Sequence, residues 1–210
     1  MMEKNLSDKV INRLTLYHSI LTDYIEKNIE YISSPQIAEL LHVDNTQVRK
    51  DIALLNYKGK CKVGYKVKEL KLLIEETLKF KKVKMAFIVG SGNLGMALAK
   101  YDNFEAYGFN ISALFDISPE KVGTSINGKD VFHLNDLPKI AEKNDAKIVI
   151  LTVPRKNAQE VTDFIVKAGI RYIWNFTPCV LSVPNNVQVW NENLIGNFLQ
   201  FTVNHGVEDN

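Results

Sequence analysis

The sequence predicts an α/β protein of two domains: a small, mainly helical N-terminal domain over residues 1–82 and a doubly wound parallel sheet over residues 83–210. Three observations predict this architecture. An apolar strand runs into a glycine-rich turn and a helix at residues 84–101. Apolar strands alternate with helical segments after it, and three helical segments and a lysine-rich hairpin precede it.

The first strand of the second domain leads into three spaced glycines. It reads Lys84-Met-Ala-Phe-Ile-Val-Gly90-Ser91-Gly92-Asn93-Leu94-Gly95. Gly90 allows the tight turn, Gly92 has no Cβ to keep a pyrophosphate from the backbone, and Gly95 lets the helix pack close to the strand. The helix N-terminus then offers free N–H groups and a partial positive charge to the phosphates. This context predicts a Rossmann dinucleotide-binding domain.

An acidic residue follows the second strand of this domain. The strand Ile111–Phe115 ends in Asp116, about 20 residues past the last glycine, where a carboxylate can accept both ribose hydroxyls of an adenosine. The carboxylate would repel a 2′-phosphate and no Arg follows it, so NAD(H) is favoured over NADP(H). The alternative is a structural glycine turn followed by a helix-capping Asp.

The composition narrows the class of protein. No run approaches 18 apolar residues, and the polar N-terminus lacks the apolar core of a signal peptide, so neither a membrane span nor secretion is expected. Cys61 and Cys179 are far apart and form no CxxC or Cys/His cluster. This pattern suits a reducing cytoplasm and argues against a metal site.

The N-terminal domain begins with helical patterns that have recognisable ends. Ser7 is a candidate N-cap for the first helix, Ser34 for the second, and Pro35 suits the first position of that second helix. Two short helices joined by a tight turn predict a helix-turn-helix. The predicted helices span residues 7–29, 33–41 and 46 to about 57.

The third helix has one apolar and one polar face. Val48, Ile52 and Leu55 form the inward stripe. The exposed N-terminal end carries Thr46, Gln47, Arg49 and Lys50, and this end of a recognition helix meets base edges in the major groove. Gln can pair with adenine and Arg with guanine. An ordinary solvated helix face is the alternative.

A lysine-rich hairpin over residues 58–68 favours the DNA interpretation. It predicts a wing, so that the domain is a winged helix-turn-helix. Residues 45–68 carry seven Lys and Arg against one acid, and residues 1–84 carry 16 against 11, whereas residues 85–210 carry 10 against 13. We expect DNA contacts from Thr46, Gln47, Arg49, Lys50, Lys58, Lys60 and Lys62.

The remaining segments complete the doubly wound sheet. Strands are predicted at residues 147–154, 170–178 and 187–190, with helices from 136, from 157 to 169 and from 191 to about 205. The carboxyl ends of parallel strands form the ligand edge. The expected NAD(H) contacts are Gly90, Ser91, Gly92, Asn93, Leu94, Gly95, Asp116, Thr152, Val153, Pro154, Asn175, Thr177 and Pro178.

With both domains in place, the chain resembles the Rex family of bacterial redox-sensing transcriptional repressors from about Val10 to Val203. The resemblance implies a homodimer on a palindromic, AT-rich operator, release of DNA by NADH but not NAD+, no enzymatic activity, and a last helix exchanged between subunits. The motifs that carry it are Ser33-Ser34-x-x-Ile37-Ala38-x-x-Leu41, Gln47-Val48-Arg49-Lys50-Asp51, Val63-Gly64-Tyr65, the glycine turn, Phe115-Asp116, Pro119-Glu120-Lys121-Val122-Gly123, Leu151-Thr152-Val153-Pro154 and Asn175-Phe176-x-Pro178.

The sequence departs from the family pattern at four places. Leu54-Leu55-Asn56 replaces Tyr-Phe-Gly, and Cys61-Lys62 replaces the Arg-Gly pair of the wing, where Lys offers a point charge in place of a planar fork. Ser19 stands where an Arg is common, and Asn193-Leu194 replaces Asp-Phe, whereas Tyr101 is kept. These changes bear on operator sequence and on discrimination between NADH and NAD+.

Two other functions remain open. A related protein could bind DNA and an adenine dinucleotide without redox discrimination. A small NAD-dependent oxidoreductase would need an acid or base near the nicotinamide and a substrate domain. His18 and His42 fall in the DNA module, His133 is expected in a loop, His205 in the last helix, and little chain remains for a substrate domain. Cys61, flanked by lysines, is either a thiol sensor or an ordinary small residue.

Overall fold

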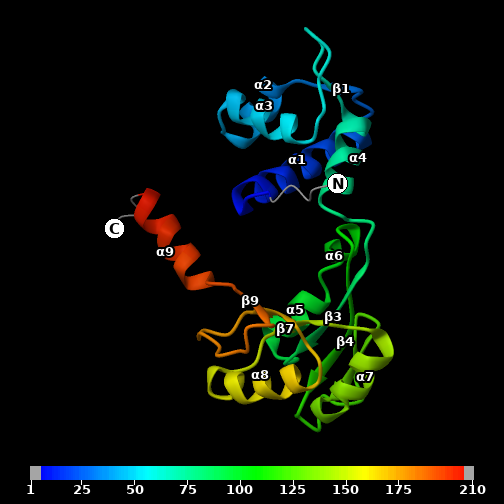
Figure 1. Ribbon diagram of the computed structural model, residues 1–210, viewed down its shortest axis with the longest axis vertical. Coiled ribbons are helices and arrows are strands. Elements are labelled where there is room, and N and C mark those ends of the chain that lie inside the picture. The colour runs from blue at the N-terminus through cyan, green and yellow to red at the C-terminus, as the bar shows by residue number, and fades with distance from the viewer. Residues whose placement is uncertain (1–5, 206–210) are drawn as a thin grey trace. The chain divides into compact units, whose positions relative to one another are not determined.

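The computed structural model describes residues 6–205. The chain divides into two compact units, residues 1–82 and 83–210 (Figure 1). Each unit has its own apolar core, so each is a domain in the structural sense.

The first unit packs four helices around one core. Its buried side chains come from every helix, and Val48 and Ile52 turn inward as the helical spacing predicted. Two very short strands pair antiparallel beside the helices. The helix-turn-helix is therefore confirmed. The elements are α1 (Asp8–Glu26), β1 (Tyr31–Ile32), α2 (Ser34–Leu41), α3 (Asn45–Leu54), β2 (Tyr65–Lys66) and α4 (Val67–Thr77).

The N-terminus of α2 is capped by Ser33, so the expectation of Ser34 was wrong. The Ser33 hydroxyl accepts a hydrogen bond from the Gln36 backbone N–H at 3.4 Å, and the Gln36 side chain accepts from the Ser33 N–H at 2.8 Å. This reciprocal pair is a capping box. Ser34 lies inside the helix, where its buried hydroxyl accepts from Arg49 Nε at 3.1 Å. Gln36, three residues after Ser33, was the signal that separates the two serines.

Ser33→Ala is expected to lower the free energy of unfolding of the first unit by about 1 kcal/mol, because the Gln36 backbone N–H at the helix end loses its acceptor. Ser33→Asp keeps an acceptor at the cap and serves as the matched control. Urea denaturation of the full chain, followed by far-UV circular dichroism, measures both variants. Equal losses in the two variants would show that the hydroxyl does not act as a cap.

The wing is a tighter structure than the hairpin predicted over residues 58–68. A single bridge joins Lys60 to Gly64, and the strand that follows pairs with β1 instead of with the other arm of the hairpin. Gly64 has φ +107°, and a Cβ there would lie 2.4 Å from the Ile32 carbonyl oxygen. Because only glycine fits this approach, Gly64 fixes the loop against β1.

The second unit is built on a seven-stranded sheet of order β5-β6-β4-β3-β7-β8-β9. All neighbouring strands run parallel except β5, which is antiparallel to β6. The crossover from β4–β6 on one side of β3 to β7–β9 on the other is the doubly wound order that was predicted. The strands are β3 (Lys84–Val89), β4 (Phe109–Asp116), β5 (Ser125–Ile126), β6 (Lys129–His133), β7 (Ile148–Leu151), β8 (Tyr172–Asn175) and β9 (Gln188–Asn191).

Alternate residues of β3 enter two different cores. Phe87 and Val89 pack with residues of α7 and α8, whereas Ile88 packs with Ala99 of α5. Helices thus cover both faces of the sheet, which is why β3 is apolar throughout. The helices are α5 (Asn93–Ala99), α6 (Asn103–Ala106), α7 (Leu137–Asn144), α8 (Ala158–Lys167) and α9 (Leu194–His205), with short 3₁₀ turns η1 (Leu134–Asp136) and η2 (Arg155–Asn157).

Several elements of this unit were not predicted from the sequence. They are α6, β5 and β6, all short and only partly apolar. His133 is the last residue of β6, paired with Asp116 of β4, so its expected place in a loop was wrong. Its Nδ1 accepts from the Asn135 N–H at 3.2 Å, which shapes the turn into η1. His133 therefore has a structural role at the carboxyl end of β6.

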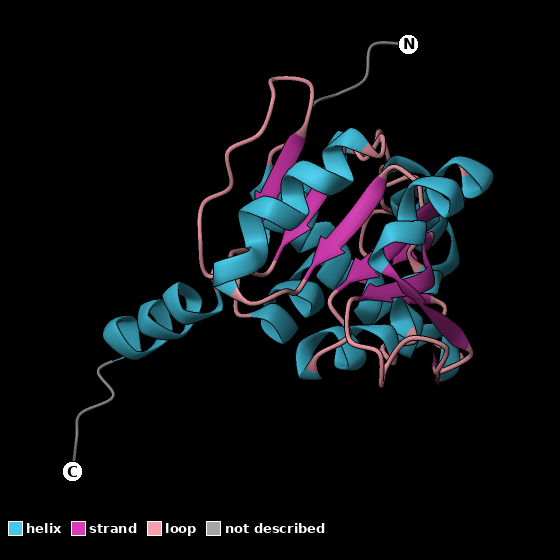
Figure 2. Ribbon diagram, turned by 90° about the horizontal axis from the view of Figure 1, so that it is seen from below, coloured by secondary structure: helices cyan, strands magenta, loops and turns pink. Residues whose placement is uncertain are grey.

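The last helix, α9, presents apolar side chains to solvent. Leu194, Ile195, Phe198 and Leu199 are between 53% and 67% exposed. Figures 1 and 2 both draw α9 standing away from the sheet of its own unit. An amphipathic helix normally buries its apolar face. None of the helices within residues 6–205 is long and apolar enough to cross a membrane.

Candidate functional site

The turn after β3 has the geometry that its glycines suggested. Gly90 has φ +101°, and Gly92 is the N-cap of α5. A Cβ on Gly95 would lie 2.0 Å from the Gly90 carbonyl oxygen, so Gly95 allows the helix to approach the turn. A Cβ on Gly92 would meet no atom within 4 Å. The space beside Gly92 is therefore free for a ligand.

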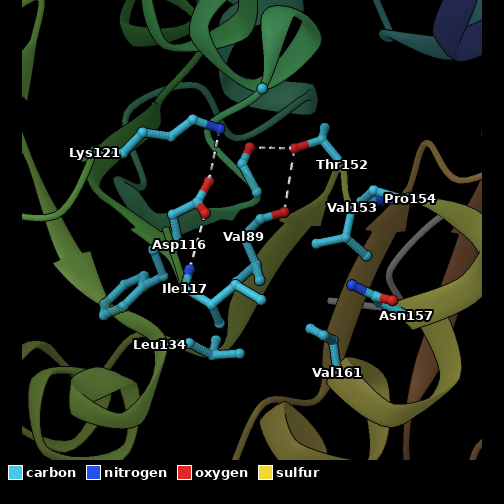
Figure 3. A pocket seen from close by; sticks show the side chains of 13 residues that line it. Val89, Asp116, Ile117, Lys121, Leu134, Thr152, Val153, Pro154, Asn157 and Val161 are labelled. Atoms are coloured by element: carbon cyan, nitrogen blue, oxygen red, sulfur yellow. Dashed lines mark hydrogen bonds and ion pairs between the residues drawn. The ribbon is translucent and has the colours of Figure 1, made fainter. Parts of the chain in front are cut away.

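A cavity of about 440 Å³ opens at this turn, between the carboxyl ends of β3, β4 and β7 (Figure 3). Its wall contains six of the residues expected to contact a dinucleotide: Gly90, Gly92, Asp116, Thr152, Val153 and Pro154. Sequence reasoning missed the others, which are Val89, Phe115, Ile117, Lys121, Leu134, Asn157 and Val161. Of these, Ile117 and Lys121 follow Asp116 closely and could have been found from that position alone.

Asp116 is held by five hydrogen-bond donors of its own unit. Its Oδ2 accepts from the Ser91 N–H at 2.8 Å, from the Ser91 hydroxyl at 2.6 Å and from Lys121 Nζ at 3.4 Å. Its Oδ1 accepts from the N–H groups of Ile117 at 2.9 Å and Ser118 at 3.0 Å. Burial alone would raise the pKa of Asp116, but the Ser91 bonds, followed by Ser118 and Lys121, hold it below its usual value. The carboxylate is thus a fixed negative charge beside one cation.

Thr152 shapes the glycine turn from behind. Its hydroxyl donates to the carbonyl oxygens of Gly90 at 2.7 Å and Val89 at 3.1 Å, as the dashed lines in Figure 3 show. The hydroxyl would also lie 3.0 Å from a Cβ at Gly95. Thr152 therefore connects the end of β7 to the turn after β3 and holds the turn in place.

Thr152→Val is expected to weaken NADH binding about 10-fold, because the turn loses two bonds and a methyl group faces two carbonyl oxygens. Thr152→Ser keeps the hydroxyl and should bind NADH within about twofold of the wild type. Isothermal titration calorimetry on the full chain measures both. If the serine variant were weakened as much as the valine variant, the role assigned to the hydroxyl would be wrong, because serine keeps both hydrogen bonds.

The other residues expected at the nucleotide site do not line this cavity. Ser91 and Gly95 are buried beneath the turn, and Asn93 and Leu94 lie in the first turn of α5. Asn175 and Thr177 form a buried polar cluster after β8, in which Asn175 Oδ1 accepts from the Thr177 hydroxyl at 2.6 Å and Asn175 Nδ2 donates to Asn191 Oδ1 at 2.8 Å. Pro178 is exposed beside them. Asn175 and Thr177 thus order the loop after β8.

The first unit presents a basic surface at α3 and the wing. Thr46, Arg49, Lys50, Lys58, Lys60 and Lys62 are exposed. Arg49, Lys60 and Lys62 line a groove of about 420 Å³ with Ser33 and Ser34 of the α2 N-terminus. Lys60 Nζ donates to the Tyr31 hydroxyl at 3.3 Å. Three of the five positive charges predicted to meet DNA thus line one groove.

Gln47 differs from its neighbours because it belongs to a buried network. Its Nε2 donates to Asp51 Oδ1 at 2.9 Å, and Asp51 is only 1% exposed. Arg13 of α1 also reaches that carboxylate, through Nε at 2.6 Å and Nη2 at 2.8 Å, and the Tyr17 hydroxyl donates at 2.8 Å. This network ties the recognition helix to α1.

The residues that could bind metal or react as thiols are dispersed. Across residues 6–205, no group of three or more His, Cys, Asp or Glu side chains could hold a metal ion. Cys61 is exposed in the wing. Cys179 is half-buried, and its Sγ lies 3.2 Å from the Thr177 hydroxyl.

Known proteins resemble this chain over nearly its whole length. The redox-sensing transcriptional repressor Rex of Desulfitobacterium hafniense is 40% identical over 201 residues, covering 96% of each chain. The same repressor of Clostridium acetobutylicum is 38% identical over 192 residues, covering 91% of this chain and 90% of the relative. The chain belongs to the Rex family.

Solved structures and family descriptions agree with this Rex assignment. The crystal structure of RSP, a Rex-family repressor, in complex with beta-NAD+ and operator DNA is 34% identical, with a TM-score of 0.86 over 97% of this chain and 94% of the other. RSP in complex with beta-NADH gives a TM-score of 0.83. Two family models match the chain. The model described as "CoA binding domain" matches residues 81–179, and the model described as "Putative DNA-binding protein N-terminus" matches residues 5–53. The resemblance and the two-part fold predicted from the sequence are therefore confirmed.

Asn193 and Ser19 differ from the family pattern, whereas Tyr101 keeps it, and the structure shows the surroundings of all three side chains. Asn193 Oδ1 accepts from the Gly196 N–H at 2.9 Å, so the amide caps the start of α9. Ser19 is exposed on α1. Tyr101 is 54% exposed, and its hydroxyl accepts from Asn103 Nδ2 at 3.4 Å.

Proposed function

We propose that this Rex-family chain is a transcriptional repressor that binds operator DNA through its first unit and NAD(H) through its second, with NADH releasing the DNA. One observation carries the proposal. The cavity at the glycine turn and the basic winged helix occur in one chain that matches, over 97% of its length, a repressor crystallised with beta-NAD+ and operator DNA. The same relative was crystallised with beta-NADH.

The roles proposed for individual residues follow from their positions. Gly90 and Gly92 border the space for the pyrophosphate, and Asp116 and Lys121 lie where the adenosine ribose would bind. Ser91, Asn93, Leu94 and Gly95 build the turn and helix around that space, and Thr152, Val153 and Pro154 form the opposite wall. Asn175, Thr177 and Pro178 are proposed to border the nicotinamide end.

On the DNA side, the proposed contacts fall into two kinds. Gln47, Arg49, Lys50 and Thr46 on α3 would meet base edges and phosphates in the major groove. Lys58, Lys60 and Lys62 of the wing would contact phosphates, because exposed lysines supply charge without base specificity.

The proposed assembly is a homodimer on a palindromic, AT-rich operator. Support comes from α9, whose apolar side chains are more than half exposed in the single chain. A partner subunit that received this helix would bury them. Two copies of the winged helix would then meet two half-sites, as expected for a symmetric operator.

We infer that the protein is a transcriptional regulator and not an enzyme. The residues proposed to border the nicotinamide end, Asn175, Thr177 and Pro178, carry no acid or base. Hydride transfer to a substrate usually needs a free acid or base near the nicotinamide. A protein acting on genomic DNA would work in the cytoplasm.

Repression coupled to NADH requires a difference in affinity. NADH must bind the DNA-free form more tightly than the DNA-bound form, by about 1–3 kcal/mol if the coupling is typical. NAD+ must show little such difference, since a ligand with equal affinity for both forms shifts nothing.

The test is a titration of the full chain onto a fluorescent, AT-rich palindromic duplex, followed by NADH and NAD+ added separately at fixed salt. We expect NADH to release the duplex and NAD+ not to. If neither nucleotide changes binding to this duplex or to an operator selected from random sequence, the chain is a DNA-binding relative without redox discrimination.

A further inference from the structure

One polar side chain at the apolar end of the cavity is not used by the fold. Asn157 is the N-cap residue of α8, and Asn is a favoured residue there because its side-chain oxygen can accept a backbone N–H. The Asn157 side chain makes no such capping bond. It lines the cavity instead, and it has no hydrogen-bond partner within residues 6–205.

The side chains around Asn157 are apolar. Val153, Pro154 and Val161 come from the same segment after β7, and Ile117 and Leu134 come from the ends of β4 and β6. Figure 3 draws Asn157 and Val161 on one side of the cavity and Ile117 and Leu134 on the other. A single amide between two apolar walls is the usual arrangement for a flat heteroaromatic ring, whose faces are apolar and whose edge is polar.

The order of groups along the cavity shows which ring this would be. The glycine turn lies at the phosphate position and Asp116 at the ribose position, so the apolar end beyond Asp116 is left for the base of the adenosine half. We propose that Asn157 reads the edge of the adenine base and is the residue that selects adenine. This inference rests on the proposed function, because it assumes that NAD(H) occupies the cavity.

The chemistry of an amide matches the edge of adenine. The N6 amino group of adenine donates, and a ring nitrogen beside it accepts. An Asn side chain has one carbonyl oxygen that accepts and one NH₂ group that donates. Both groups of Asn157 remain available, because neither is used to cap α8.

The experiment compares two ligands and two variants by isothermal titration calorimetry on the full chain. The ligands are NADH and 1,N6-etheno-NADH, in which a two-carbon bridge removes the N6 donor. The variants are Asn157→Leu, which has similar size but no polar group, and Asn157→Ser, which keeps a good helix cap but is too short to reach the base.

We expect wild-type protein to bind NADH about 10-fold more tightly than the etheno analogue. Both variants should lose about that factor for NADH and change little for the analogue, so that the two ligands become nearly equal. A purely structural role of Asn157 would not produce this dependence on the ligand.

Four results would overturn the inference. Wild-type protein could bind both ligands equally, or both ligands could weaken equally in the variants. Asn157→Ser could keep wild-type NADH affinity while Asn157→Leu loses it, which would make Asn157 a helix cap. Failure of wild-type protein to bind NADH would overturn the proposed function as well, whereas the first three results leave that function standing.

Discussion

Gly92→Ala is expected to weaken NADH binding by about 100-fold while leaving the fold nearly unchanged. Gly92 lines the cavity at the N-cap of α5, and a Cβ there meets no protein atom within 4 Å. Its φ of −71° suits any residue. The added methyl group would therefore occupy only the space that a pyrophosphate needs to reach the helix N-terminus.

Gly95→Ala is the matched control for this prediction. A Cβ at Gly95 would lie 2.0 Å from the Gly90 carbonyl oxygen, so this variant must distort the turn and should lower the melting temperature as well as NADH affinity. Gly92→Ala should lose affinity with a change in stability of at most about 1 kcal/mol. Calorimetric titration and differential scanning calorimetry measure the two effects. Wild-type NADH affinity in Gly92→Ala would mean that the phosphates do not pass this turn.

The parts of the molecule that were predictable from sequence depend on local causes. The apolar strand, the glycine turn and the helix of residues 84–101 follow from spacing along the chain, and the structure has them where expected. Asp116 was found because a strand and an acid adjoin in sequence. The inward stripe of α3 follows from helical periodicity in the same way.

The parts that escaped prediction depend on contacts between distant segments. The pairing of β1 with β2 needs Gly64 to pass close to Ile32, which no local pattern reveals. Asn157 has the sequence position of a helix cap, and only the tertiary structure shows its side chain on a cavity wall. Thr152 lines the cavity, and only the tertiary structure shows that its hydroxyl also donates to the Gly90 carbonyl oxygen.

Asp51→Ala is expected to lower the free energy of unfolding of the first unit by about 3–5 kcal/mol and to abolish DNA binding. Asp51 is 1% exposed and accepts from Arg13, Tyr17 and Gln47, so its removal leaves the Arg13 guanidinium without its carboxylate. Gln47, on the face proposed to read bases, loses its anchor as well. A typical domain has only about 5–15 kcal/mol of stability, so a loss of this size is severe.

The same network makes the stability of the first unit depend on pH. Burial alone would raise the pKa of Asp51, but hydrogen bonds from Arg13, Tyr17 and Gln47 outweigh it and hold the pKa below its ordinary value. Because the folded-state pKa is the lower one, the stabilisation is fully present above the unfolded pKa of about 4. It is lost as pH falls through the folded-state pKa, and Asp51→Asn should lack this acid-dependent loss.

Tyr17→Phe separates the charge from the hydrogen bonds. This variant removes one of the four bonds to Asp51 and leaves the Arg13 pair intact, so it should lower stability by only about 1–2 kcal/mol and keep the acid dependence. Urea denaturation of the full chain at pH 7 and at several values below pH 4, together with duplex binding, measures all three variants. If Asp51→Ala lowered the free energy of unfolding no more than Tyr17→Phe does, water would have to solvate the Arg13 guanidinium once Asp51 is removed. The network would then orient Gln47 without holding α1 to the recognition helix.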